Sequence, residues 1–270
     1  MMIRATSRAA IDSWWVSMEN SDLQVERPAA TSVISMPPSF GWRKTALAYG
    51  AAGMLLWVAT RVLLPAVEAA TGWEPLVVWF IAGGFGFFLP LAMVGLAMVW
   101  MERRPRGVAL WRDRLWFRRM NRGDWMWGLA GLGFVYALCA LSMLVLRLFW
   151  GDVPLEPPFL KTEPLSTGRW WILAAWIPFF LVNILGEELL WHGVLLPRQE
   201  TALGRRAALA SGLGWLGMHA AFGVPILLTL WPATLITPYV VQRRRNVWLG
   251  VLIHAGLNGP GFLAVAFGLV

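Results

Sequence analysis

Seven apolar stretches occupy most of the chain, and each is long enough, or nearly so, to cross about 30 Å of membrane hydrocarbon. They cover residues 45–67, 76–101, 125–149, 170–196, 207–223, 225–241 and 247–269. Charged residues make up only 14% of the sequence, whereas a soluble domain carries about 25%. We therefore predict an all-α polytopic transmembrane bundle of about seven helices, in which Gly223-Val224-Pro225 separates the two shortest.

The connections between these stretches alternate in charge. Eight arginines lie in the connection 102–124, and further arginines lie at 198–206 and 243–245, while the alternate connections are acidic or neutral. Because basic loops remain on the cytoplasmic side, we predict a plasma-membrane protein with a cytoplasmic N-terminus and an outside C-terminus. The net charge of +8 could also suggest nucleic acid. The arginines cluster between apolar runs, however, so we expect membrane lipids and no nucleic acid as partners.

The same stretches divide the chain into three regions. Residues 1–41 are predicted to be a cytoplasmic tail, since they lack the apolar core and cleavage site of a removable signal peptide. Residues 42–169 hold three accessory helices, and their basic segment 102–124 interleaves aromatic residues with arginines, as expected of a segment lying on headgroups. Residues 170–270 hold four helices. The single Cys139 lies in an apolar run, which excludes a disulfide framework and a zinc ribbon.

Ionisable side chains gather in the last four stretches. All three histidines, His192, His219 and His254, lie there, together with the adjacent pair Glu187-Glu188. An ionisable residue near mid-bilayer costs about 2.5–3.5 kcal/mol on insertion scales, so such residues are functional by default. The distances along the chain from the basic loops place Glu187, His219 and His254 at depths of roughly 14–20 Å on three helices. We therefore expect one shared acid–base site.

Spacing within the helices predicts which residues share a face. Three pairs are four residues apart: Glu188 and His192, Trp215 and His219, and His254 and Asn258. Glu187 points about 100° away from Glu188, so the two carboxylates are expected to have different partners. Buried His and Glu can also serve only as hydrogen-bond partners between helices. For Glu188 with His192 we expect a mainly structural pair, and for Trp215 a wall of the site.

Three short motifs carry these residues. They are Gly186-Glu187-Glu188-Leu189-Leu190-Trp191-His192-Gly193, Trp215-Leu216-Gly217-Met218-His219, and His254-Ala255-Gly256-Leu257-Asn258. Their order and spacing resemble the CPBP family of CAAX proteases and bacteriocin-processing enzymes, also called the Abi family. The family pattern is two glutamates, three residues and Arg-Gly, then an aromatic four residues before His, then His four residues before Asn. The resemblance covers about residues 170–270, which it identifies as a catalytic core.

The resemblance implies an intramembrane endopeptidase in which Glu187 and His219 activate a water, and His254 with Asn258 stabilises the oxyanion. The residue chemistry agrees, because a desolvated Glu is a usable general base and both His and Asn can donate to an oxyanion. Glu187, His219 and His254 could alternatively form a His₂Glu zinc site with an open position. The cofactor is therefore either none, or zinc or another divalent metal.

Two positions depart from the family pattern, since His192 stands where the family has Arg and Trp215 where it has Phe. The change at 192 removes a permanent cation beside Glu188 and puts activity in question. We predict an endopeptidase that cleaves a peptide or protein terminus near the cytoplasmic membrane face. The alternatives are a non-catalytic immunity or scaffold protein of the same family and a proton-coupled transporter, against which the lack of an inverted sequence repeat counts.

Overall fold

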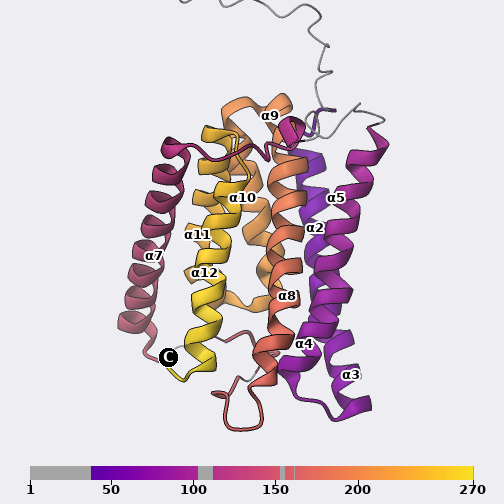
Figure 1. Cartoon of the computed structure of the whole chain (residues 1–270), viewed down its shortest axis with the longest axis vertical. Helices are drawn as coiled ribbons and strands as arrows, with labels where there is room; N and C mark the ends of the chain where they lie inside the picture. Colours follow the sequence, from indigo (N-terminus) through magenta and orange to yellow (C-terminus); the bar gives the residue numbers. More distant parts are fainter. Residues whose placement is uncertain (1–37, 103–111, 153–155, 161, 270) are drawn as a thin grey trace, which may run out of the picture. The chain divides into compact units, whose positions relative to one another are not determined.

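The computed structural model describes residues 38–102, 112–152, 156–160 and 162–269, and every regular element in these ranges is helical (Figure 1). The prediction of an all-α membrane bundle is confirmed. The predicted tail 1–41 lies outside the described ranges except for its last residues. The helices, labelled as in Figure 1, are α2 (Trp42–Val58), α3 (Leu64–Thr71), α4 (Pro75–Gly83), α5 (Leu89–Met101), α7 (Arg122–Trp150), α8 (Trp171–Glu187), α9 (Leu196–Leu203), α10 (Ala207–Met218), α11 (Val224–Arg244) and α12 (Trp248–Ala266).

Six helical stretches of the described chain are long and apolar enough to cross a membrane. They are Trp42–Thr71, Pro75–Met101, Arg122–Trp150, Trp171–Phe222, Val224–Arg244 and Trp248–Ala266. The fourth stretch folds back at Gly204, whose φ of +56° follows the end of α9. A straight helix would separate Glu187 from Trp215, 28 residues later, by roughly 42 Å. Their side chains instead hydrogen-bond at 2.5 Å, so this stretch supplies two arms and the multi-pass bundle has the seven predicted.

Three π-helical segments interrupt the arms, and each is followed at once by a Leu-Pro pair. They are Ala59–Leu63 before Leu64-Pro65, Gly84–Phe88 before Leu89-Pro90, and Glu188–Leu195 (η3) before Leu196-Pro197. Proline has no amide hydrogen and its ring clashes with the carbonyl four residues earlier. The turn before it therefore widens, and π-helical turns are frequent at functional sites. The third segment carries Glu188 and His192 and so shapes the candidate site.

The arms pack in a definite order. α10 packs against α2 and α11, α7 packs against α11 and α12, and α5 packs against α8 (Figure 1). Many large apolar side chains face outward, and Phe85, Trp100, Leu148 and Phe149 each keep 70–79% of their surface exposed. Apolar surface of this extent fits contact with lipid.

The arginine-rich connections lie at one end of the bundle, here called the basic end (residues 112–121, 198–206 and 243–246). Partly buried ion pairs organise it, since Glu102 accepts from both Arg198, at 2.5 Å, and Arg114, at 2.6 Å. The basic end therefore ties α5 to α9 through charged side chains.

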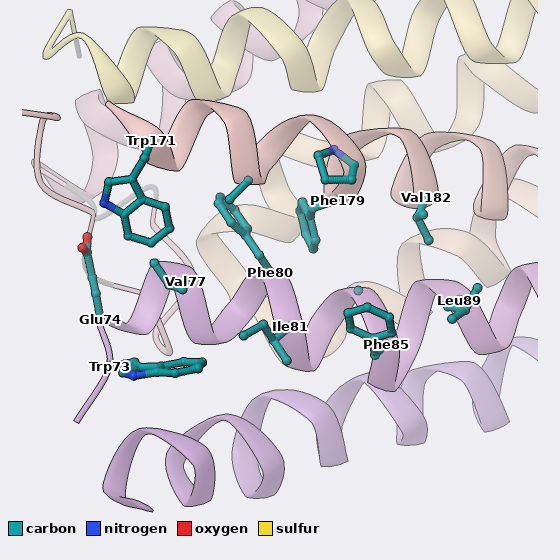
Figure 2. A pocket seen from close by; sticks show the side chains of 13 residues that line it. Trp73, Glu74, Val77, Phe80, Ile81, Phe85, Leu89, Trp171, Phe179 and Val182 are labelled. Carbon is teal, nitrogen blue, oxygen red and sulfur yellow. The ribbon is translucent and has the colours of Figure 1, made fainter. Parts of the chain in front are cut away.

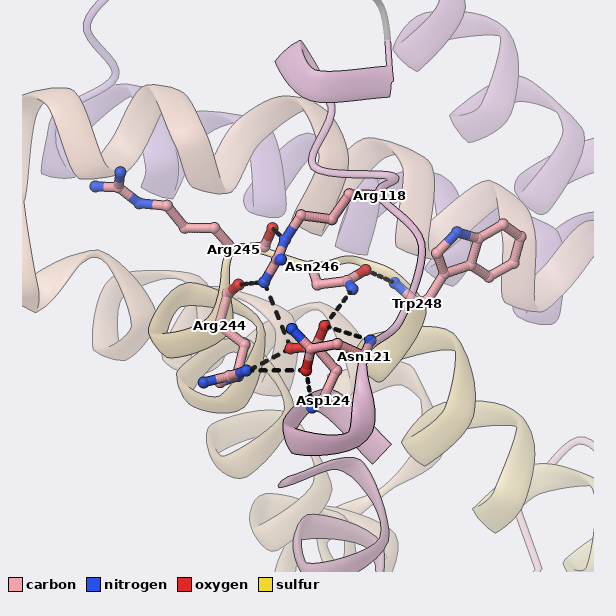
Figure 3. A network of polar contacts seen from close by, with 7 residues as sticks. All are labelled: Arg118, Asn121, Asp124, Arg244, Arg245, Asn246 and Trp248. Atoms are coloured by element: carbon pink, nitrogen blue, oxygen red, sulfur yellow. Dashed lines mark hydrogen bonds and ion pairs between the residues drawn. The ribbon is translucent and has the colours of Figure 1, made fainter. Parts of the chain in front are cut away.

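A second polar network at the basic end centres on Asp124, the fully buried residue in the first turn of α7 (Figure 3). Its carboxylate accepts from Arg244 Nε at 2.9 Å, from Asn246 Nδ2 at 3.2 Å and from the Asn121 amide at 3.1 Å. Asn121 Oδ1 accepts from the Asp124 amide at 2.8 Å, which completes a capping box. Arg118 also pairs with Asp124, at 3.4 Å. The network joins the start of α7 to the turn between α11 and α12.

The described part of the basic segment 102–124 packs partly against the bundle, and its predicted position on headgroups stays a prediction. Leu115 packs against the main core, and Trp116 and Phe117 pack against a cluster that includes Val247. The Val247 amide also donates to the Trp116 carbonyl at 3.0 Å. Protein covers these apolar side chains in part. Residues 103–111 of the segment lie outside the described ranges.

Candidate active site

The predicted site residues come from three helical arms and gather around the indole of Trp215. They are Glu187 at the end of α8, Glu188 and His192 in η3, Trp215 in α10, His219 directly after α10, and His254 and Asn258 in α12. The Trp215 ring centroid lies 5.1 Å from that of His254, 5.3 Å from that of His192 and 6.0 Å from that of His219. All seven side chains except Asn258 are buried. The folded-back arm thus brings the three motifs into one cluster.

Glu187 is held by two indole rings. Its Oε2 accepts a hydrogen bond from Trp215 Nε1 at 2.5 Å and a second from Trp191 Nε1 at 3.2 Å. Among the described residues no cation pairs with this carboxylate, and Oε1 has no protein hydrogen-bond partner. Oε1 is therefore the atom that can accept a proton from a water.

Glu188 bridges two histidines. Its Oε2 lies 2.6 Å from His192 Nδ1, and its Oε1 lies 3.1 Å from His254 Nδ1. Glu188 and His192 have no exposed surface, and a β-carbon at Gly250 would overlap the Glu188 carboxylate, so α12 can approach η3 this closely only with glycine there. The two carboxylates have different partners, in agreement with their expected directions. Glu188 also reaches His254, a contact that the spacing along the chain does not indicate.

His254 continues this chain of hydrogen bonds to Asn258. Asn258 Nδ2 lies 3.1 Å from His254 Nε2. If His254 is neutral and donates through Nδ1 to Glu188, its Nε2 accepts from Asn258. The second hydrogen on Asn258 Nδ2 then remains available to a substrate. A chain of contacts therefore runs from His192 through Glu188 and His254 to Asn258, and it orients the Asn258 amide donor.

His219 is oriented by the backbone. Its Nδ1 lies 2.8 Å from the carbonyl oxygen of Trp215, one helical turn earlier, and its ring meets Phe222 edge-on at 5.2 Å. Because the hydrogen is then on Nδ1, the lone pair is on Nε2, which suits a general base. Among the described residues no hydrogen bond joins His219 to Glu187. Trp215 contacts both groups, Glu187 through its indole N–H and His219 through its backbone carbonyl.

Two aromatic residues of the site were missed by sequence reasoning. Trp191 follows Glu187 by four residues, so the same spacing rule that paired Glu188 with His192 could have found it. Tyr49 of α2 stacks on Trp191 with centroids 4.3 Å apart and an interplanar angle of 25°. No pattern in the sequence relates Tyr49 to a residue 142 positions later in the chain.

The described residues do not form a group of three or more His, Cys, Asp or Glu side chains placed to hold a metal ion. Both nitrogens of His254 are engaged, by Glu188 and Asn258. Oε2 of Glu187 already accepts two indole donors. In this arrangement Glu187, His219 and His254 therefore do not fit a three-ligand zinc site.

A separate groove of about 600 Å³ lies between α4 and α8 (Figure 2). Its lining is almost wholly apolar, with Trp73 and Trp171 toward one end and Leu89 and Val182 toward the other. Glu74 lines it as well, and this carboxylate forms an ion pair with Arg169. None of the seven predicted site residues lines the groove.

Comparison with protein families gives one match, which lies in the last part of the chain. Residues 169–259 match the family described as type II CAAX prenyl endopeptidase Rce1-like. The match includes all seven predicted site positions and confirms the resemblance inferred from the three motifs. Neither a curated protein nor a solved structure matches the chain.

Proposed function

We propose that this multi-pass membrane protein is an intramembrane endopeptidase, because residues 169–259 match the Rce1-like family of type II CAAX prenyl endopeptidases. It cleaves a peptide or protein terminus near the cytoplasmic face of the plasma membrane. The observation that carries the proposal is the burial of the three family motifs in one cluster around Trp215. Acid–base side chains at such depth in a membrane protein are costly, so they are functional by default.

In the proposed reaction Glu187 Oε1, assisted by His219 Nε2, accepts a proton from a water as its oxygen attacks the scissile carbonyl. The tetrahedral intermediate collapses with cleavage of the carbon–nitrogen bond, and the proton passes to the leaving amine nitrogen. Asn258 Nδ2 donates to the oxyanion, and one such donor contributes about 2.7–4 kcal/mol to the transition state. His254 orients Asn258, and donates directly only when it is protonated on both nitrogens.

Glu188 and His192 are proposed to support this machinery without touching the substrate. Glu188 Oε1 accepts the Nδ1 hydrogen of His254, and the other oxygen of Glu188, Oε2, contacts His192. The spacing along the chain predicted that Glu188 and His192 form a structural pair. We propose that this pair also orients His254 and Asn258.

We propose that the reaction needs no metal, because the engaged atoms of His254 and Glu187 leave the predicted zinc set incomplete. The test is cleavage by purified protein before and after prolonged dialysis against a chelator, with metal analysis of both samples. Unchanged turnover at undetectable zinc is expected. Loss of turnover that returns with added zinc would assign the metal mechanism instead.

The substrate class is tested with purified protein in proteoliposomes. A library of peptides with free C-termini, together with detergent-extracted membrane proteins, is incubated with the parent and with Glu187→Gln, and new termini are identified by mass spectrometry. New termini in the parent sample alone support the proposal. Identical terminus profiles for both proteins would reject endopeptidase activity and favour the non-catalytic immunity or scaffold function, for which the His192 departure from Arg is the specific argument.

Orientation gives a prediction that is independent of catalysis. With the N-terminus in the cytoplasm, a cysteine at Asp113 should react with an impermeant maleimide only after the membrane is opened. A cysteine at Lys161, which lies outside the described ranges, should react in intact cells. Cys139→Ser supplies the background. The reverse labelling pattern would place the substrate entrance on the outer face.

The His192 position gives a prediction about pH. If the pair with Glu188 acts as a charged brace, it needs a cation at position 192. His192→Arg should then retain activity at about pH 9, since a guanidinium stays charged. His192→Ala should impair activity from about pH 6 to pH 9. If His192→Ala cleaves as fast as the parent throughout, His192 is no part of the mechanism.

A further inference from the structure

The two indoles that hold Glu187 stand at positions for which the family pattern specifies no N–H donor. Trp215 occupies the place of a Phe, and Trp191 occupies one of the three unspecified residues of the first motif. A phenylalanine ring has no N–H and could not bind the carboxylate. In this chain both rings donate to the same oxygen, Glu187 Oε2, at 2.5 and 3.2 Å. The exchange at position 215, which looks mild in sequence, therefore changes what contacts Glu187.

Trp191 is itself fixed by a residue from outside the family segment. Tyr49 of α2 lies flat against the Trp191 indole, and only 2% of Tyr49 is exposed. The Tyr49 hydroxyl hydrogen-bonds Ser211 of α10 at 2.8 Å. A β-carbon at Gly214 would overlap the Tyr49 ring, so glycine at this position is needed for the ring to lie there. One ring therefore connects α2, α10 and η3.

We propose that Trp191 and Trp215 are positioning residues that hold the Glu187 carboxylate with Oε1 turned toward the reacting water, and that Tyr49 of α2 locks Trp191 in this position. This arrangement of Trp191, Trp215 and Tyr49 at Glu187, here called the clamp, is a property of the folded protein. The statement that it serves catalysis rests on the function proposed above.

The physical reason is the lack of a countercharge. A buried carboxylate is costly unless it is paired or hydrogen-bonded, and no cation pairs with Glu187 among the described side chains. Hydrogen bonds to an ionised acceptor are roughly twice as strong as those between neutral groups. Two indole N–H groups on one oxygen supply this stabilisation, occupy that oxygen, and fix which oxygen faces the water. Because an indole is neutral, this stabilisation brings no counter-ion that would attract the carboxylate away from the substrate.

The clamp is tested without any substrate by NMR of the indole N–H groups in the nitrogen-15-labelled full-length protein in nanodiscs. Trp191→Phe and Trp215→Phe assign the two signals among the 19 tryptophans. Glu187→Gln keeps the shape but removes the charge, so both assigned protons should move upfield while other indole signals stay in place. Tyr49→Leu should move the Trp191 signal, whereas Tyr49→Phe, which keeps the stacked ring, should not. If Glu187→Gln leaves both signals unmoved, the clamp does not exist in solution.

Its role in positioning is tested on a peptide that the parent protein cleaves. Trp215→Phe should lower kcat at least about tenfold with little change in KM, because a hydrogen bond to a charged group is lost after the substrate is already bound. Trp231→Phe is the matched control, since Trp231 Nε1 donates to Ser142 between α11 and α7, away from Glu187. Equal kcat values for the two variants would overturn the positioning role. An intact NMR signature in a protein that cleaves no peptide would instead reject the proposed function and leave the clamp standing.

Discussion

Glu187→Gln should reduce kcat/KM at least about a hundredfold while the protein stays folded, because general-base catalysis contributes about 10²–10⁴ to a rate. Glutamine has the shape of glutamate and keeps a carbonyl oxygen that can accept from Trp191 and Trp215. It cannot, however, accept a proton from water at neutral pH. The measurement is initial cleavage rate in proteoliposomes, together with thermal unfolding in the same detergent used for purification.

The control for this prediction is Glu163→Gln, an equally conservative change at an exposed residue far from the cluster along the chain. It should leave both the rate and the unfolding temperature unchanged. A Glu187→Gln protein that cleaves at the parent rate would remove Glu187 from the mechanism. A variant that no longer folds would show that the carboxylate is needed for structure, and the activity loss would then carry no mechanistic meaning.

Glu188→Ala should have the largest effect on stability, a loss of about 3–5 kcal/mol, as is typical when one partner of a buried charged group is removed. Glu188 has no exposed surface and contacts His192 and His254 at once. Its removal leaves two buried imidazole nitrogens without a partner and opens a cavity against Gly250. The measurement is reversible unfolding in mixed micelles, followed by tryptophan fluorescence.

The matched comparison is Glu200→Ala. Glu200 pairs with Arg245 at 3.2 Å, but the side chains keep 25% and 65% of their surface exposed. An exposed ion pair contributes only about 0–1 kcal/mol, so this variant should unfold close to the parent. Similar losses for the two variants would mean that burial does not set the strength of the Glu188 contacts. A Glu188→Ala, His254→Ala double variant less destabilised than the sum of the single changes would show that the two side chains act together.

Much of the membrane architecture follows from the sequence because its causes are local. An apolar stretch of sufficient length forms a helix wherever it lies in lipid, since no water is there to satisfy its backbone. The charges between stretches are also local, and they give a prediction of orientation because basic loops remain on the cytoplasmic side. The Leu-Pro pairs at 64–65, 89–90 and 196–197 are equally local signals, and each follows a π-helical segment. Even the Glu188–His192 contact lies within one helical turn.

The contacts of the candidate site depend on how the helices pack against one another. Apolar surface covers most sides of a lipid-facing helix, so hydrophobic periodicity does not set its rotation about its own axis or its depth against a neighbour. A rotation of one residue, about 100°, would exchange Glu187 with Glu188 in front of His254. Only the packed bundle selects Glu188 for that histidine, Glu187 for the indole of Trp215, and Tyr49 for the face of Trp191. The sequence by itself determined the membrane arms and the residue types that meet in them. The tertiary structure decided their pairings, because close approach at small residues such as Gly250 and Gly214 sets the rotation that spacing along one helix leaves open.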